Sequence, residues 1–415
     1  MTPGSSGGHG LRRRTLLGSG VGAALAGSAA ALTAAGPAGP VAAAASQTSP
    51  GPRTIAFYGD RQAGVTTPPQ THTRWVALDL ARGSGLADLR RVLRMWTQDL
   101  ARITQGVPPL ADHTPELTLD PAHLSVTVGL GRSAFARLGR LDLAPPWLRE
   151  LPSFATDALQ DRWSGGDVVL QIGSSSLEAT ARVQRALVRA AGSTTTPRWT
   201  QAGHRGPSPE PSWATQRNAF GQVDGTVQPA VDGLDDDLLW RDASSGPWEH
   251  ASTLVLRRVA MNLDTWEQLD PVAKEAAIGR RLADGAPLTG GGERTPPDLH
   301  ATDADGLTVI DPSSHMARAM PREPWERFLR RPYSFEVPGA DDVGTLTRAQ
   351  TARSAHGLLF AAYCADAHRQ YVPVQRRLAE ADLLNIWTVT TGSTLVAVLP
   401  GVHPGEALGE RVLDG

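Results

Sequence analysis

The sequence predicts an α+β fold built from two β-α-β-β-α units with antiparallel sheets. Three observations support this class: strand-like and helix-like segments in that order in the first half of the chain, a similar order in the second half, and a polar stretch rich in Pro and Gly between them. With 415 residues, 40% of them hydrophobic and 20% charged, the chain can bury a large core. The composition therefore indicates a folded, soluble protein of two or three domains.

The first unit begins with a strand and a long helix. Residues 74–80 alternate apolar and polar side chains as a strand does, and residues 86–103 carry apolar side chains at helical spacing. The remaining predicted elements are strands at 124–128 and 167–172, a helix at 177–191 and a connector at 192–212.

The second unit returns to the same kinds of element. Its helix at 271–282 has Pro271 in the first turn, where the missing N–H costs nothing. The other predicted elements are strands at 253–261, 358–363 and 394–399 and a helix at 374–384. Two such units form duplicated ferredoxin-like halves, the arrangement of dimeric α+β barrels.

Residues 285–338 fit neither unit. The region is rich in Pro, Gly and Asp and is longer than an ordinary loop. Because structureless loops of this length are usually functional, we expect a site here.

The first 45 residues form a predicted export signal. Arg12, Arg13 and Arg14 precede a weakly apolar stretch without any charge up to Pro52, and small residues at 43–45 match a cleavage site. A membrane anchor is the alternative, but frequent Gly and Pro dilute the hydrophobicity that a stable span needs. The paired arginines resemble a twin-arginine signal, read by a translocase for folded proteins. The expected product is extracellular, periplasmic or associated with the cell envelope.

These features predict three parts of the chain. Residues 1–45 are the twin-arginine signal peptide, residues 46–212 the N-terminal ferredoxin-like half, and residues 213–415 the C-terminal half.

Charge and cysteine content exclude several classes of function. The formal net charge of −2 argues against a nucleic-acid partner, because phosphate recognition needs a concentrated basic surface. The single cysteine, Cys364, excludes an intramolecular disulfide and a cysteine-rich metal site.

Three kinds of side chain stand out as candidates for chemistry. His315 lies in the unusual region 285–338 just after a helix-start signal, although a lone histidine is more often structural. Asp224 stands near glycines in a mostly apolar stretch, where an unpaired carboxylate would be costly. Arg330 and Arg331 add permanently charged guanidinium groups. A histidine, an acid and an arginine are the groups that a haem peroxidase requires.

The order of these motifs resembles the dye-decolorizing peroxidases, and in particular their exported branch, which includes deferrochelatase/peroxidase proteins. The Gly-x-x-Asp-Gly motif at 221–225 is followed by His315 and by the Arg330-Arg331 pair. Segments 57–68 and 357–360 are also similar to the family, so that the resemblance covers nearly the whole chain after residue 45. It implies two ferredoxin-like halves with haem in the second.

The resemblance also implies a role for each matching residue. His315 would be the proximal iron ligand and the metal-binding residue, Asp224 the distal acid–base residue, and Arg330 the distal arginine. Asp366 would be the acid that hydrogen-bonds the proximal imidazole. The remaining cofactor-binding candidates are Arg318 or Arg331, either of which would contact a haem propionate, and Gly225 and Thr226 beside the acid.

Three positions depart from the family's pattern. Arg61 stands where histidine is usual, Gln222 where an aromatic residue is usual, and residues 249–252 where a Gly-rich segment is usual. The last two are expected to change the shape of the pocket and hence substrate preference.

The implied activity is reduction of hydrogen peroxide at ferric haem b, one haem per chain, with phenols or bulky dyes as aromatic one-electron donors. Asp224 would move a proton between the peroxide oxygens, and Arg330 would stabilise the developing negative charge. Trp387 is a candidate for oxidation of large donors at the surface, although a packed core role is commoner for tryptophan.

Other readings of the sequence stay open at this stage. The same pocket could serve a deferrochelatase that releases iron from haem during iron uptake, and a secreted binding protein without cofactor is a third reading. The twin-arginine translocase is the expected partner in export, and homo-oligomerisation is left undecided.

Overall fold

The computed structural model describes residues 53–109, 120–206, 215–229, 235–337 and 356–414, all within one compact unit, Pro50–Gly415. The predicted signal at residues 1–45 and the predicted boundary between residues 212 and 213 lie outside the described residues, so that both stay predictions. Within the described ranges, no helix combines the length and the apolar character needed to cross a membrane.

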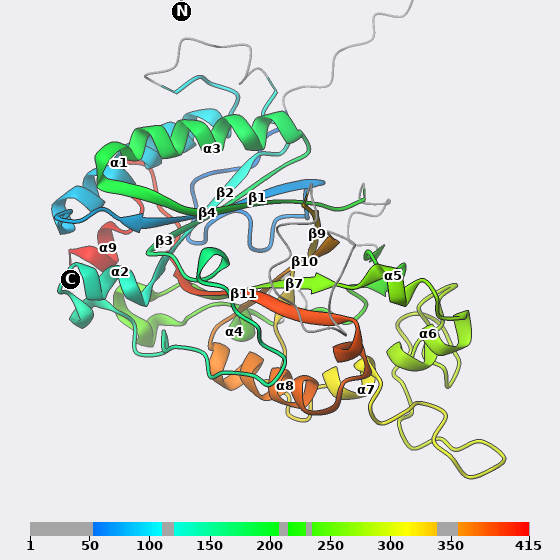
Figure 1. Cartoon of the computed structure of the whole chain (residues 1–415). Coiled ribbons are helices and arrows are strands. Elements are labelled where there is room, and N and C mark those ends of the chain that lie inside the picture. Colours follow the sequence, from blue (N-terminus) through cyan, green and yellow to red (C-terminus); the bar gives the residue numbers. More distant parts are fainter. Residues whose placement is uncertain (1–52, 110–119, 207–214, 230–234, 338–355, 415) are drawn as a thin grey trace, which may run out of the picture. The chain divides into compact units, whose positions relative to one another are not determined.

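Two long helices lie together on one side of the strands of the first half (Figure 1). The predicted helices 86–103 and 177–191 form with those bounds, because each carries a continuous apolar stripe along the face that it buries. Trp96 of the first helix is fully buried and donates through Nε1 to the carbonyl of Leu187 in the second, 2.9 Å away. The elements are β1 (His72–Leu80), α1 (Leu86–Ile103), β2 (Ser125–Gly131), α2 (Arg132–Arg137), β3 (Val168–Ser174), α3 (Leu177–Ala191) and β4 (Thr195–His204).

Strand β4 lies where the sequence predicts a connector, at 192–212. Residues 195–204 pair antiparallel with β1, so that the connector prediction was wrong for these residues. The sequence did not predict this strand because Pro197 has no N–H to donate to a neighbouring strand, and proline is therefore rare inside sheets. In the structure Pro197 lies opposite Leu78, where the register shifts at an irregularity of the ladder.

The second half repeats strands and helices around a longer insertion. Helix α6 ends at Ile278, earlier than predicted, because Gly279 takes a left-handed conformation with φ of 88°. Helix α8 starts seven residues before the predicted 374, and Pro373 lies inside it. The elements are β5 (Gln216–Arg217), β6 (Val223–Asp224), α4 (Asp236–Leu239), β7 (Ser252–Met261), α5 (Leu263–Trp266), α6 (Pro271–Ile278), α7 (His315–Ala319), β8 (Leu329–Arg330), β9 (Tyr333–Glu336), β10 (His356–Cys364), α8 (Ala367–Ala381), β11 (Thr388–Val398) and α9 (Glu410–Leu413).

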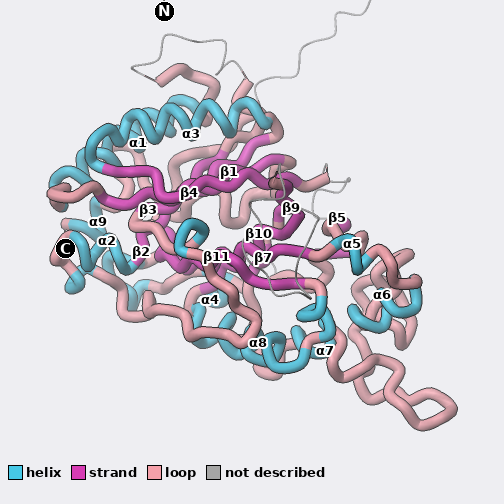
Figure 2. The backbone as a smooth tube through the Cα atoms, in the orientation of Figure 1, coloured by secondary structure: helices cyan, strands magenta, loops and turns pink. Residues whose placement is uncertain are grey.

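The strands of the two halves form one antiparallel sheet that closes on itself. Its order is β7-β11-β2-β3-β1-β4-β9-β10, with β8 also on β10, and β10 pairs again with β7. In Figure 2 the strands lie between α1 and α3 on one side and α7 and α8 on the other. The predicted α+β class with antiparallel sheets in a barrel-like arrangement is therefore confirmed.

Alternation along the strands separates the barrel interior from the outer face. Leu254 and Leu256 of β7 pack inside with Trp75 of β1, whereas Val255 packs outside with Tyr371 of α8. The outer face of the second half, covered by α7 and α8, is where the cavity described next is found.

Candidate active site

A cavity of about 290 Å³ lies between the outer sheet face of the second half and helices α7 and α8. The apolar part of its sheet wall includes Val259, Leu358 and Phe360. Three of the predicted site residues, His315, Asp224 and Arg330, line it together. Two of these three side chains, His315 and Arg330, come from region 285–338, where the sequence predicts a site.

Helix α7 begins at His315 because the residue before it caps the helix. Ser314 is fully buried, and its Oγ accepts a hydrogen bond from the main-chain N–H of Ala317 at 3.4 Å. Gly279 packs against this cap: a Cβ there would come within 2.9 Å of the Ser314 hydroxyl. A left-handed glycine at the end of α6 thus lets the first turn of α7 lie close to it.

His315 is oriented by a carboxylate from the far end of α8. Its Nδ1 lies 2.6 Å from Oδ2 of Asp382, a side chain that is 4% exposed. Since a carboxylate only accepts, Nδ1 carries the proton and Nε2 keeps its lone pair for a ligand. The imidazole is 37% exposed and lines the cavity.

The charge of Asp382 also sets the basicity of the imidazole. Burial by itself lowers the pKa of His315, but the attraction and the hydrogen bond of Asp382, with a smaller contribution from Asp224, outweigh it and raise the pKa above 6.5. Asp382 therefore makes this histidine a stronger electron donor to a bound metal.

The prediction for Asp366 was wrong. Its carboxylate caps helix α8 and accepts from the main-chain N–H groups of His368 and Arg369 at 2.9 and 3.2 Å. The acid that contacts His315 is Asp382, 67 residues along the chain from it. No local motif marks Asp382, because its role depends on a contact between α7 and the segment that follows α8.

Asp224 and Arg330 lie close together without a tight ion pair. Oδ1 of Asp224 is 3.9 Å from Nη1 of Arg330, and its Oδ2 accepts from the amide of Asn218 at 3.4 Å. Arg330 is fixed instead by the carbonyl of Val227, 2.9 Å from Nη2. Asp224 is 15% exposed and open to the cavity, so that its oxygens can accept a proton from a ligand.

The other predicted cofactor contacts divide into two groups. Gly225 and Thr226 line the cavity beside Asp224. Arg331 does not line it: its guanidinium points into the barrel and donates to the carbonyl of Thr67 and, at 2.7 Å, to Gln70. Arg318 is also absent from the cavity wall in the part of the chain that the structure describes. A propionate contact through Arg331 is therefore wrong, because Arg331 directly follows the last residue of β8 and its side chain points away from the cavity.

The positions that depart from the family's pattern have different neighbours. Arg61 makes a two-pronged ion pair with Asp236 at 2.9 and 2.6 Å, away from the cavity. Gln222 lines the cavity, is 3% exposed, and its Nε2 has no partner among the described residues. His250 adopts a positive φ of 66°. Of these, Gln222 is the one that lines the pocket.

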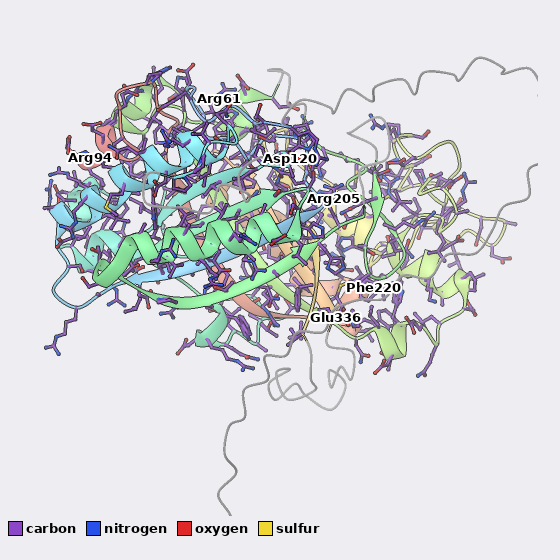
Figure 3. All side chains as sticks on the ribbon, turned by 90° about the horizontal axis from the view of Figure 1, so that it is seen from above. Arg61, Arg94, Asp120, Arg205, Phe220 and Glu336 are labelled. Carbon is purple, nitrogen blue, oxygen red and sulfur yellow. The ribbon has the colours of Figure 1, made fainter. Side chains whose placement is uncertain are left out.

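Aromatic side chains lie in the cavity wall and behind it. Figure 3 shows Phe220 beside the short helices α5 and α6, and its ring lies 4.5 Å from Trp266. Trp387, the candidate for surface oxidation, is half-buried and packs edge-on against Trp266 at 5.2 Å. Burial raises the pKa of Tyr371 in the cavity wall to about 12, so that its hydroxyl stays protonated and donates to Gln375.

The residues present fit haem. A flat porphyrin requires apolar walls, which Leu358, Phe360 and Leu378 provide. Its iron requires one protein ligand with a free lone pair, which Asp382 secures on Nε2 of His315. Its carboxylates require cations, and arginines including Arg330 line the same cavity.

Comparison with known proteins defines the family. Residues 62–205 match the family model "Dyp-type peroxidase, N-terminal" and residues 215–403 match "Dyp-type peroxidase, C-terminal". The chain is 37% identical over 372 residues to the dye-decolorizing peroxidase of Thermobifida fusca, covering 85% of this chain and 84% of that protein. It is 30% identical over 367 residues to the deferrochelatase of Escherichia coli K12, covering 83% and 84%.

A solved structure agrees. The DyP-type peroxidase from Cellulomonas bogoriensis superposes with a TM-score of 0.82 at 44% identity, over 88% of this chain and all of that one. The chain belongs to the Dyp-type peroxidases, a family of haem-binding oxidoreductases that act on peroxide. The resemblance to the dye-decolorizing peroxidases stated from the motifs is confirmed.

Proposed function

We propose that the chain is a haem b peroxidase of the dye-decolorizing type, with one haem per chain, that reduces hydrogen peroxide and oxidises phenolic or dye-like one-electron donors. The observation that carries this proposal is the presence of His315, Asp224 and Arg330 in one cavity. Bound haem supplies the one-electron chemistry of iron, which side chains alone do not offer.

Each of the three side chains has a defined task. Nε2 of His315 would hold the iron, and Asp382 keeps the imidazole electron-rich. Asp224 would accept a proton from one oxygen of hydrogen peroxide and return it to the other; bound haem would hold the remaining oxygen and supply the two electrons that release of water requires. Arg330 lies close enough to stabilise the negative charge that develops on the departing oxygen.

Replacement of the proton carrier tests this assignment. Asp224→Asn should retain haem but lose dye turnover by roughly 10²–10⁴-fold, the usual contribution of a positioned acid–base group. Asp237→Asn is the matched control, because Asp237 is an exposed acid outside the cavity wall. Steady-state oxidation of an anthraquinone dye with peroxide measures both. An Asp224→Asn variant as active as wild type would exclude Asp224 as the carrier.

Iron release from haem is the second candidate function, favoured by the 30% identity to proteins named deferrochelatase. It uses the same cavity and the same histidine. Peroxide-dependent dye oxidation and the yield of metal-free porphyrin from added haem should be measured on one preparation. We expect dye oxidation to dominate; stoichiometric recovery of metal-free porphyrin with negligible dye turnover would favour iron release.

The proposed place of action is outside the cytoplasm, after export by the twin-arginine translocase. Support comes from the three arginines at 12–14 and the uncharged stretch that follows them. N-terminal sequencing of the exported protein should begin at Ser46. Retention of the full-length chain in the cytoplasm would contradict this localisation.

A further inference from the structure

The arginines of the cavity wall differ in how their charges are compensated. Arg257 forms a buried ion pair with Asp157. Arg327 makes a two-pronged ion pair with Asp235, at 3.0 and 3.1 Å. Both guanidinium groups are therefore neutralised by the protein itself, and neither needs an anion in the cavity.

Arg280 is compensated differently. It is 7% exposed, and its Nη1 donates to two main-chain carbonyls, those of Gly285 at 2.7 Å and Glu293 at 2.8 Å. Over the described ranges of the chain, its Nε and Nη2 make no hydrogen bond and no carboxylate lies within 4 Å. Arg280 is thus a fixed cation in the cavity wall with donors to spare.

The surroundings of Arg280 are unfavourable for an uncompensated charge. Burial lowers the pKa of Arg280, and repulsion from Arg330 lowers it further, while Glu293 opposes both. A buried cation of this kind is stabilised strongly when an anion with matching geometry binds beside it.

The loop that carries Arg280 is fastened to the segment that carries Asp224. Arg217 donates to the carbonyls of Leu282 and Ala283 at 2.6 and 2.8 Å. Gly285 packs so closely on Val223 that a Cβ would come within 2.8 Å of it. Arg280 is therefore held in place relative to Asp224 before any ligand arrives, which reduces the entropy lost on binding.

We propose that Arg280 is the anchor for a propionate carboxylate of the haem. This inference rests on the proposed haem peroxidase function. A guanidinium fork with free donors is the side chain best matched to a carboxylate. The assignment replaces Arg331, whose guanidinium points into the barrel, and assigns the contact to the wall arginine that has no carboxylate partner of its own.

Esterified haem tests the anchor on the unaltered protein. Haem and haem dimethyl ester, which lacks both negative charges, are bound to wild-type protein, and their release to excess apomyoglobin is followed by absorbance. We expect the ester to leave about 10- to 100-fold faster, the range for losing a charge-assisted hydrogen-bonded pair. A release ratio near one in wild type would overturn the proposal without any variant.

The variant then identifies the arginine. In Arg280→Met, haem should leave nearly as fast as its ester, so that the ratio collapses toward one. Arg281→Met is the matched control, because the neighbouring Arg281 is 41% exposed and pairs with Asp284; it should keep the wild-type ratio. An Arg280→Met variant that discriminates as well as wild type would assign the carboxylate to another residue.

Failure of the proposed function looks different from failure of this inference. Wild-type protein that shows no Soret band with either porphyrin would refute haem binding itself. A normal Soret band with unchanged release ratios would refute the Arg280 anchor alone.

Arg280→Lys serves as a second variant, because Arg280 also holds its loop and lysine keeps the positive charge. This variant should retain part of the discrimination between haem and its ester. A release ratio as low as that of Arg280→Met would contradict the proposal.

Discussion

His315 owes its orientation to one carboxylate, and this contact could not be read from the sequence. The histidine itself stood out because it follows a helix-start signal inside an unusual region. Asp382 did not, because 67 residues separate it from His315 and only the packing of α7 against the end of α8 brings them together. Asp366, which the sequence had suggested for this contact, instead caps the N-terminus of α8.

Replacement of Asp382 should weaken the bond between iron and imidazole. In Asp382→Asn the amide oxygen is a poorer acceptor than a carboxylate, so that the imidazole donates less electron density to the metal. The iron–histidine stretching frequency of the ferrous protein should fall, and peroxidase turnover should drop about 10- to 100-fold. Resonance Raman spectroscopy measures the first effect and dye oxidation the second.

Asp366→Asn is the control for this prediction. Asparagine also caps helices well, so stability should change by less than about 1 kcal/mol, and the iron–histidine frequency should stay at the wild-type value. If Asp366→Asn moved that frequency and Asp382→Asn left it in place, the assignment of the two acids would have to be reversed.

At the scale of elements, α7 is short and depends on its neighbours for its position. A buried ion pair joins Glu326, which lies between α7 and β8, to Arg377 of α8 at 2.8 Å. Arg377 also donates to the carbonyl of Met320 at the end of α7, 3.0 Å away. This network holds the helix that begins with His315.

The Glu326 pair should make stability depend on pH in acid. Burial by itself raises the pKa of Glu326, but Arg377 and the main-chain N–H of Arg322 outweigh it and hold the pKa below 4.5. The unfolded chain therefore binds a proton at a higher pH than the folded chain does. The stabilisation is present above pH 4.5 and is lost as the pH falls through the lower folded-state value.

Glu326→Gln tests this pH dependence. The variant should be less stable than wild type by about 2 kcal/mol at neutral pH, and the difference should shrink as the pH falls below 4.5. Urea unfolding at a series of pH values measures it. A difference that stays constant with pH would show that the charge of Glu326 contributes nothing.

The elements that the sequence predicted best are those with a strong local signal. Helices α1 and α3 have long apolar stripes, and their predicted bounds were correct. Strand β4 was missed because Pro197 and polar residues mask its alternation, and the start of α8 was missed because Pro373 normally ends a helix. The predicted propionate contact of Arg331 was wrong because only the folded backbone decides which of the two neighbouring arginines, Arg330 or Arg331, faces the cavity.

At the scale of the whole described unit, the two halves contribute differently. The cavity is lined almost entirely by residues after 213, with Thr156 as the contribution of the first half. The first half instead completes the closed sheet through β4 and β2, which pair with β9 and β11. Closure of the sheet places β10 between β7 and β9 and leaves little room for side chains where the three strands meet.

Gly357 marks this crowded position. A Cβ there would overlap the ring of Phe335 and the carbonyl oxygen of Val259. Gly357→Ala should destabilise the protein by about 1–3 kcal/mol, because the backbone of β7 cannot move aside without opening the sheet. Gly292→Ala is the control, since nothing lies within 4 Å of the added carbon. Equal denaturant midpoints for the two variants would contradict the closed-sheet argument.

The central claim is that one cavity holds haem through His315. The absorption spectrum of the purified protein with added haem tests it most directly. Wild type should show a Soret band, and His315→Ala should lose stable haem binding on gel filtration. A colourless wild-type protein, or a His315→Ala variant with an unchanged Soret band, would contradict it.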